Sequence, residues 1–170
     1  MGVGTKTEVL KLIFFAPDES DSSATVIEHY RPLNKEDHFI FVPVFDFHAL
    51  SSFLPMKPSS LVKIDVEGAE FEVLLGLDDW IKAYQPYLLL EILPVYSKEN
   101  QDRLRRQEEI EALIRNWNYK ISRIKKTNPI GIEEIGTIEI HSSIEDCDYL
   151  LYPASSIRKI ESCFPKIYNS

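Results

Sequence analysis

The sequence predicts an α/β fold whose central sheet is mostly parallel. Two short apolar runs, residues 61–64 and 87–93, have the composition of buried strands. Each is followed by apolar residues at helical spacing, and a third strand pattern begins at residue 119. This alternation of strands and helices is typical of parallel βαβ units with right-handed crossovers. Beyond residue 130 strand patterns follow one another without a long helix, so we expect one antiparallel strand near the C-terminus.

The first part of the chain predicts an N-terminal β-hairpin. Residues 8–15 and 24–30 have strand patterns, and the acidic, serine-rich residues 17–23 separate them. Another apolar and aromatic strand is predicted over residues 39–44. Asp46 can cap a short helix after it, because its carboxylate can accept the free N–H groups of a first helical turn.

The central part predicts the helices that connect the parallel strands. The run 61–64 is apolar apart from one lysine, which is typical of a strand covered on both faces. Helices are expected over residues 69–75, after Asp78 as a cap, and from the cap Ser97 to Asn116. The remaining strands are predicted over residues 119–124, 132–140 and 148–152.

A chain of 170 residues is long enough for one domain with a core of its own. We divide it into a hairpin and loop over 1–38, a central region over 39–153, and a tail over 154–170. Nothing at the N-terminus resembles a signal peptide, and no apolar run is long enough to cross a membrane.

The net charge of −8 disfavours a nucleic-acid partner and leaves small polar molecules, sugars or proteins. The basic runs 103–106 and 123–126 are interpreted as a solvated helix face and a strand end. Cys147 and Cys163 lack the spacing of a zinc site or a disulfide framework, so we expect reduced thiols, no metal site and a cytoplasmic location.

The candidate site lies where two predicted strands end. Asp65 and Glu67 follow the first strand, Gly68 supplies a tight strand-to-helix turn, and Glu91 stands near the end of the next strand. Neighbouring strands lie about 4.8 Å apart, so Asp65 and Glu91 are expected at one sheet edge, where α/β proteins bind ligands. Asp65, Glu67 and Glu91 are the catalytic candidates, as bases or ligands; alternatively, Asp65 only caps the following helix.

Three further residues are candidates for substrate contact. Glu70 follows the turn, although it can also simply favour a helix N-terminus through the helix dipole. Tyr96 and Lys98 lie in the predicted strand-to-helix loop just after Glu91, and such loops commonly carry binding residues.

The segment Val-Lys-Ile-Asp-Val-Glu-Gly-Ala-Glu-Phe-Glu-Val-Leu-Leu-Gly, residues 62–76, resembles the FkbM family of methyltransferases. Residues 86–91, 113–119 and 148–153 are similar to later segments of that family, so the resemblance covers roughly residues 40–153. It implies part of a Rossmann-like methyltransferase sheet, S-adenosylmethionine as the cofactor, and O-methyl transfer to a small-molecule or sugar hydroxyl.

The family's glycine-rich cofactor loop has no counterpart here. The only similar pattern, Gly2-Val-Gly4, has no strand before it, and we interpret it as incidental. We therefore expect the first strands of the family's sheet to lie outside this chain, and the isolated chain to methylate nothing. The cofactor-binding residues stay unassigned.

Two other classes of function remain open. An unpaired edge on the strand 61–64 favours association, either as a homo-oligomer or with a partner chain that covers the edge. The chain would then be a degenerate or split domain that acts through protein contacts. The third hypothesis is a divalent-metal hydrolase with Asp65, Glu67 and Glu91 as oxygen ligands.

Overall fold

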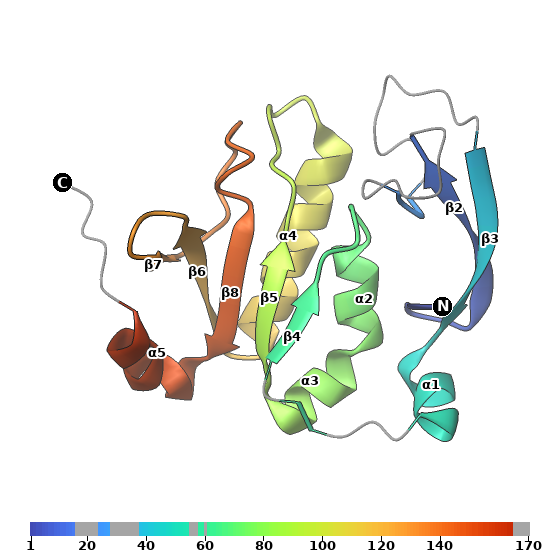
Figure 1. Ribbon diagram of the computed structural model, residues 1–170, viewed down its shortest axis with the longest axis horizontal. Coiled ribbons are helices and arrows are strands. Elements are labelled where there is room, and N and C mark those ends of the chain that lie inside the picture. The colour runs from blue at the N-terminus through green and yellow to red at the C-terminus, as the bar shows by residue number, and fades with distance from the viewer. Residues whose placement is uncertain (16–23, 28–37, 55–57, 60, 165–170) are drawn as a thin grey trace.

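The computed structural model of the protein describes residues 1–15, 24–27, 38–54, 58–59 and 61–164. These residues form a mixed α/β fold with two sheets (Figure 1). The strands are β1 (Gly2–Val3), β2 (Glu8–Phe14), β3 (His38–Phe45), β4 (Leu61–Ile64), β5 (Tyr87–Glu91), β6 (Tyr119–Lys125), β7 (Gly131–Ile135) and β8 (Asp148–Pro153). The helices are α1 (Phe47–Phe53), α2 (Glu70–Gly76), α3 (Asp78–Tyr84), α4 (Gln101–Asn116), the 3₁₀ turn η1 (Ala154–Ser156) and α5 (Ile157–Cys163).

The larger sheet has the strand order β4-β5-β8-β6-β7. Strands β4 and β5 are parallel, whereas β8 is antiparallel to both β5 and β6, and β7 is antiparallel to β6. Thus β4, β5 and β6 run in one direction, as the βαβ pattern predicts. The prediction of a mostly parallel sheet with one antiparallel strand is wrong, because the short link from β6 to β7 makes a second antiparallel strand.

The core lies between this sheet and the helices α2, α3 and α4. Leu90, Ile121 and Leu151 point from three adjacent strands into one cluster with Ile110 of α4. The alternate side chains of β8 face the other side, where Leu150 and Tyr152 form a smaller cluster with α5. Helix α5 lies within residues 154–170, for which the sequence predicted only a tail.

The smaller sheet has the order β1-β3-β2 and stands beside α2 (Figure 1). The predicted pairing of 8–15 with 24–30 is present in the described residues only as one antiparallel bridge, whereas β2 pairs along its whole length with β3, from Glu8↔Val44 to Phe14↔His38. Of residues 24–27, only Thr25 forms a bridge, to Ile13, and residues 28–30 lie outside the described part of the chain. Because Ile13 pairs with both Phe39 and Thr25, the two contacts lie on opposite edges of β2 and do not compete.

The Gly2-Val-Gly4 pattern is structural, which corrects our interpretation of it as incidental. Gly2–Val3 form β1, parallel to β3, and the Gly4 N–H donates to the Phe45 carbonyl oxygen at 3.0 Å. A Cβ built on Gly76 would lie only 2.3 Å from the Gly4 carbonyl oxygen. Glycine at position 76 therefore permits the close contact through which the small sheet docks on the end of α2.

Several predicted boundaries also change. Asn100 rather than Ser97 caps α4, through its side chain and the Arg103 N–H at 3.4 Å. Asp78 is the first residue of α3 rather than its cap, and its carboxylate accepts the Trp117 indole N–H at 2.7 Å. Strand β5 ends at Glu91, two residues earlier than predicted.

The predicted strand 132–140 stops as β7 at Ile135. The chain then turns toward α4, where the Ile138 N–H donates to Glu111 Oε1 at 2.7 Å. The Glu111 carboxylate thus accepts the Ile138 N–H, which a neighbouring strand would otherwise accept. Within the described residues, no helix is long and apolar enough to cross a membrane.

Strand β4 lies at the edge of its sheet, and among the described residues it pairs only with β5. Leu61 is 56% exposed, whereas Ile64 is buried. The prediction that both faces of this strand are covered is therefore wrong, and one edge of β4 is left without a strand partner in the described structure.

Candidate functional site

Three carboxylates stand side by side across the end of the larger sheet. The parallel register pairs Ile64 with Leu90, so Asp65 and Glu91 come next on adjacent strands, and Glu91 is in turn paired with Asp148 of β8. The structure thus brings the predicted residues Asp65 and Glu91 to one edge. Asp148 was not among the candidates, because its position beside Glu91 depends on the insertion of β8 into the sheet.

The carboxylates influence one another electrostatically. Burial raises the pKa of Glu91, and the negative charges of Asp65, Asp148 and Glu67 raise it further. Two lysines limit this repulsion: Lys63 Nζ lies 2.6 Å from Asp65 Oδ2, and Lys126 Nζ lies 2.7 Å from Asp148 Oδ2. Glu91 is therefore a stronger base than an ordinary surface glutamate.

Asp65 does not cap the following helix. The N-cap residue of α2 is Ala69, which makes no side-chain cap hydrogen bond. The Asp65 carboxylate forms an ion pair with Lys63, and the Asp65 side chain is 32% exposed. Asp65 is thus accessible at the strand end, as the functional interpretation of this residue requires.

The turn at Glu67 and Gly68 has an unusual backbone. Glu67 has φ 50° and Gly68 has φ 102°, two successive residues in the left-handed region. Glycine adopts this conformation readily, but for glutamate it costs roughly 1 kcal/mol. The predicted role of Gly68 as a tight-turn residue agrees with this geometry, and the strain at Glu67 needs support from neighbouring groups.

Glu70 and Arg106 supply that support. Glu70 is 5% exposed, and its Oε1 accepts the Gly68 N–H at 3.0 Å. Arg106 of α4 donates to the Gly68 carbonyl oxygen at 3.2 and 2.8 Å and forms an ion pair with Glu72. Burial raises the pKa of Glu70, while the hydrogen bond from Gly68 and the charge of Arg106 oppose that rise. Hydrogen bonds therefore hold both the N–H and the carbonyl oxygen of Gly68.

This arrangement corrects one interpretation of the basic run 103–106. Arg106 has a side chain that is only 18% exposed, so it belongs to the turn rather than to a solvated face. Arg103 lies over the Tyr96 ring, 5.7 Å from its centroid, and donates to the Pro94 carbonyl oxygen at 3.3 Å. Helical periodicity could have shown that the run covers more than one face.

Thr25 also holds the turn, and sequence reasoning missed it. Its side chain is buried, and its hydroxyl donates to the Glu67 carbonyl oxygen at 2.6 Å. Since Thr25 precedes Glu67 by 42 residues, no local pattern could have predicted this contact.

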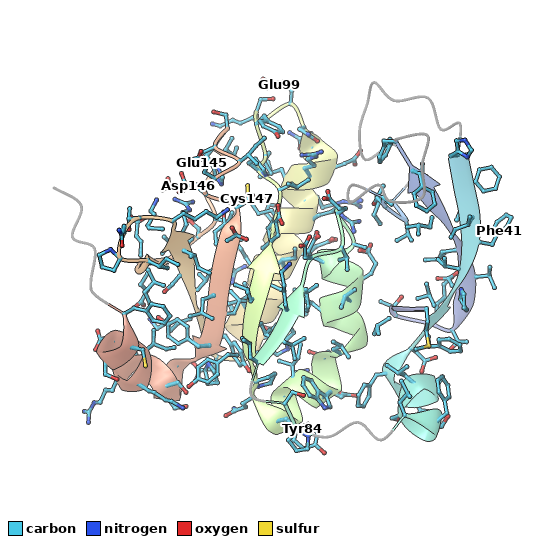
Figure 2. All side chains as sticks on the ribbon, in the orientation of Figure 1. Phe41, Tyr84, Glu99, Glu145, Asp146 and Cys147 are labelled. Carbon is cyan, nitrogen blue, oxygen red and sulfur yellow. The ribbon has the colours of Figure 1, made fainter. Side chains whose placement is uncertain are left out.

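The other substrate-contact candidates lie farther along the same edge. Tyr96 is 49% exposed in the loop before α4. Lys98 is exposed in the same loop, and its carbonyl oxygen accepts the Gln101 side chain at 2.5 Å. Figure 2 places Glu99 at the tip of this loop, with Glu145, Asp146 and Cys147 in the neighbouring segment before β8. Burial raises the pKa of the Cys147 thiol to about 11, which makes it a poor nucleophile.

A cavity of about 530 Å³ lies between the small sheet and the β4–α2 segment; we call it the inter-sheet cavity. Asp65, Val66 and Ala69 line one side, and β2 and β3 line the other. One of the candidate carboxylates therefore stands at the wall of a cavity in the size range of small-molecule sites.

A metal site would require a cluster of ligands, and a cofactor site like that of the FkbM family a glycine-rich loop. Within the described residues, no group of three or more His, Cys, Asp or Glu side chains is arranged to hold a metal ion. The Gly2-Val-Gly4 pattern, which resembles a cofactor loop only in sequence, packs against Val44 and Gly76. It leads from β1 toward β2 rather than forming a strand-to-helix turn, so it does not form the family's glycine-rich cofactor loop.

Comparison with known protein families matches residues 11–121 to the methyltransferase FkbM domain. The match spans β2 to the start of β6 and includes the carboxylates of both strand ends. No curated protein and no solved structure matches the chain.

Proposed function

The chain belongs to the FkbM methyltransferase family, and we propose that it forms the acceptor side of an S-adenosylmethionine-dependent O-methyltransferase. Asp65 and Glu91 carry this proposal, because they are adjacent carboxylates at the end of a parallel strand pair. The acceptor is a small-molecule or sugar hydroxyl, and Glu67 contributes negative charge beside the pair.

The chemistry proposed for these residues is proton removal. A carboxylate within hydrogen-bond reach of the acceptor hydroxyl takes its proton as the oxygen becomes a nucleophile. The raised pKa of Glu91 favours this residue as the base, and Asp65, which is held by Lys63, orients the hydroxyl. Glu70 then acts through the turn rather than by touching the substrate, because its carboxylate is occupied by Gly68.

The strand order supports a partial Rossmann-like sheet for this role. An edge strand followed by two crossovers in one direction is the arrangement found in half of a doubly wound sheet, with β4 at the edge of the described sheet. We propose that the 170-residue chain alone does not bind S-adenosylmethionine. Isothermal titration of the chain with this cofactor is expected to give no heat of binding, and stoichiometric binding would overturn the claim.

The acceptor role itself is tested by proton titration of the carboxylates. Carbon-detected NMR of the Glu91 side chain should give a pKa above the ordinary glutamate value of 4.5. Asp65→Asn should lower the Glu91 pKa, while Glu108→Gln on the exposed side of α4 should leave it unchanged. If the Glu91 pKa is ordinary and does not change in Asp65→Asn, the proposal that these carboxylates act as a pair is contradicted.

The second candidate function is association through β4. The edge of β4 that has no strand partner among the described residues and the exposure of Leu61 favour it, because such an edge can pair with another strand. We expect sedimentation to show a dimer that Leu61→Lys converts to a monomer, whereas Val9→Lys on the small sheet has no effect. A monomer at every concentration of the unmodified chain would exclude this candidate.

A further inference from the structure

The two walls of the inter-sheet cavity are apolar. Alternate residues of the small sheet, Leu10, Leu12 and Val42, face the cavity, and Val66 and Val73 face it from the β4–α2 side. The outer face of the same sheet points the other way, as the labelled side chain of Phe41 shows in Figure 2. An apolar interior of about 530 Å³ favours a ligand that is mostly hydrocarbon.

The polar side chains of the described lining are Thr5 and three carboxylates whose charges are already compensated. Asp65, Glu72 and Glu8 line it, and each is paired with a cation: Lys63 at 2.6 Å, Arg106, and Lys6 at 3.0 Å. These cations do not belong to the described lining. The carboxylates therefore have little need of a cationic ligand, but their free lone pairs can still accept a hydroxyl proton.

The lining also disfavours an anionic ligand. Among the described residues that line the cavity, no side chain is a lysine, arginine or histidine. Apart from the Met1 α-amino group, the described lining carries no cation, and the cations paired with its three carboxylates lie outside it. A carboxylate or phosphate on the ligand would therefore meet more negative than positive charge in the lining, which costs free energy in a partly buried site.

We propose that the inter-sheet cavity binds an uncharged, largely apolar alcohol, with its hydroxyl group at Asp65. The hydrocarbon part fills the space between the small sheet and α2, and the hydroxyl donates to the Asp65 carboxylate. This inference deepens the proposed function, since the alcohol would be the methyl acceptor. Binding of the alcohol does not itself depend on methyl transfer.

Isothermal titration of the 170-residue chain with decan-1-ol and with decanoate at pH 8 tests the ligand class. These probes share a chain length and differ in charge. We expect decan-1-ol to bind with one-to-one stoichiometry, and decanoate to bind at least tenfold more weakly. The absence of decan-1-ol binding, or equal affinity for both probes, would overturn the proposal.

Substitutions in the two walls locate the site. Leu10→Trp and Val73→Phe fill the cavity from opposite sides, and each is expected to weaken decan-1-ol binding at least tenfold. The matched controls are Val9→Trp, on the outer face of the same strand, and Leu75→Phe, on the exposed side of the same helix; both should stay within twofold. Far-UV circular dichroism checks the fold of all four variants.

The two wall variants make the location of the site falsifiable even if one of them fails to fold. Unchanged affinity in a folded wall variant would overturn the location. The cofactor is not present in any of these titrations, so a chain that proves not to be a methyltransferase can still bind the alcohol. Conversely, failure of the alcohol to bind leaves the paired-carboxylate proposal intact.

Discussion

The two sheets of this protein differ in what covers them. The five-stranded sheet buries side chains on both faces: Leu90 and Leu151 on one face are fully inaccessible, and Tyr152 on the other is 1% exposed. The three-stranded sheet exposes its outer face: Phe41 is 69% and Val9 is 65% exposed. The larger sheet therefore supplies most of the hydrophobic stabilisation, whereas the smaller one depends on its attachment to α2 and to the β4–α2 turn.

This difference places the candidate site at a boundary. The carboxylates lie on the stable sheet, but the opposite wall of the cavity comes from the sheet that is held by a few contacts. The Gly4–Gly76 approach and the hydrogen bond from Thr25 to Glu67 are two such contacts. Changes in either contact should affect the cavity before they affect the core.

The largest expected effect is the difference in unfolding free energy lost when one side chain is truncated in each sheet. Leu151→Ala removes a fully buried side chain and should lower the free energy of unfolding by about 3 kcal/mol, through lost burial and a new cavity. Phe41→Ala on the exposed face should change it by less than about 0.5 kcal/mol. Urea denaturation measures both, and comparable losses would contradict the contrast between the sheets.

The attachment of the small sheet to α2 comes next. Gly76→Ala forces a methyl group against the Gly4 backbone, with an expected cost of about 1–3 kcal/mol. Hydrogen exchange should show faster exchange in β1, β2 and β3 and little change in β5 or β8. Gly136→Ala is the control, because no atom lies within 4 Å of the added methyl group. Uniform protection in Gly76→Ala would show that the close contact is not needed.

A smaller effect is expected at the turn between the sheets. Arg106→Met removes the two hydrogen bonds to the Gly68 carbonyl oxygen and the pair with Glu72, and should cost about 1–2 kcal/mol. The Gly68 amide resonance should shift and exchange faster. Arg105→Met, on the exposed neighbour, is the control. A Gly68 amide that is the same in both variants would exclude Arg106 as a positioning residue.

The smallest effect concerns the buried carboxyl group of Glu70. The pKa of Glu70 is raised in the folded state above the ordinary value of 4.5, so the folded protein binds the carboxyl proton of Glu70 more tightly than the unfolded chain does. Stability therefore falls as the pH rises from 4.5 through the folded-state pKa.

Glu70→Gln keeps an oxygen acceptor for the Gly68 N–H but removes this titration. Thermal unfolding at several pH values should show that the variant gains stability relative to the original protein as the pH rises, and not below pH 4.5. A constant difference across that range would contradict a raised Glu70 pKa.

Much of the larger sheet was predictable because its signals are local. The apolar runs of β4 and β5 and the helical spacing between them are visible in any short window, and so is the strand-end position of Asp65 and Glu91. The Glu67-Gly68 turn was predictable from its glycine, although the positive φ of Glu67 was not.

The predictions that the structure corrects concern contacts between segments that are distant in the sequence. The long pairing of β2 with β3 was not predicted because strand patterns state which segments are extended, not which of them pair. Arg106 was taken for a solvated residue because its charge is visible in the sequence, while its partner at Gly68 lies 38 residues away.

The sequence by itself determined the family, the direction of three strands and the carboxylates at the ends of two of them, since each is encoded by neighbouring residues. Only the tertiary structure decided that Asp148 joins Asp65 and Glu91, that Thr25 and Arg106 hold the turn, and that two sheets enclose a cavity. These features depend on pairing and packing between distant segments, which follow from the free energy of the whole fold rather than from any local pattern.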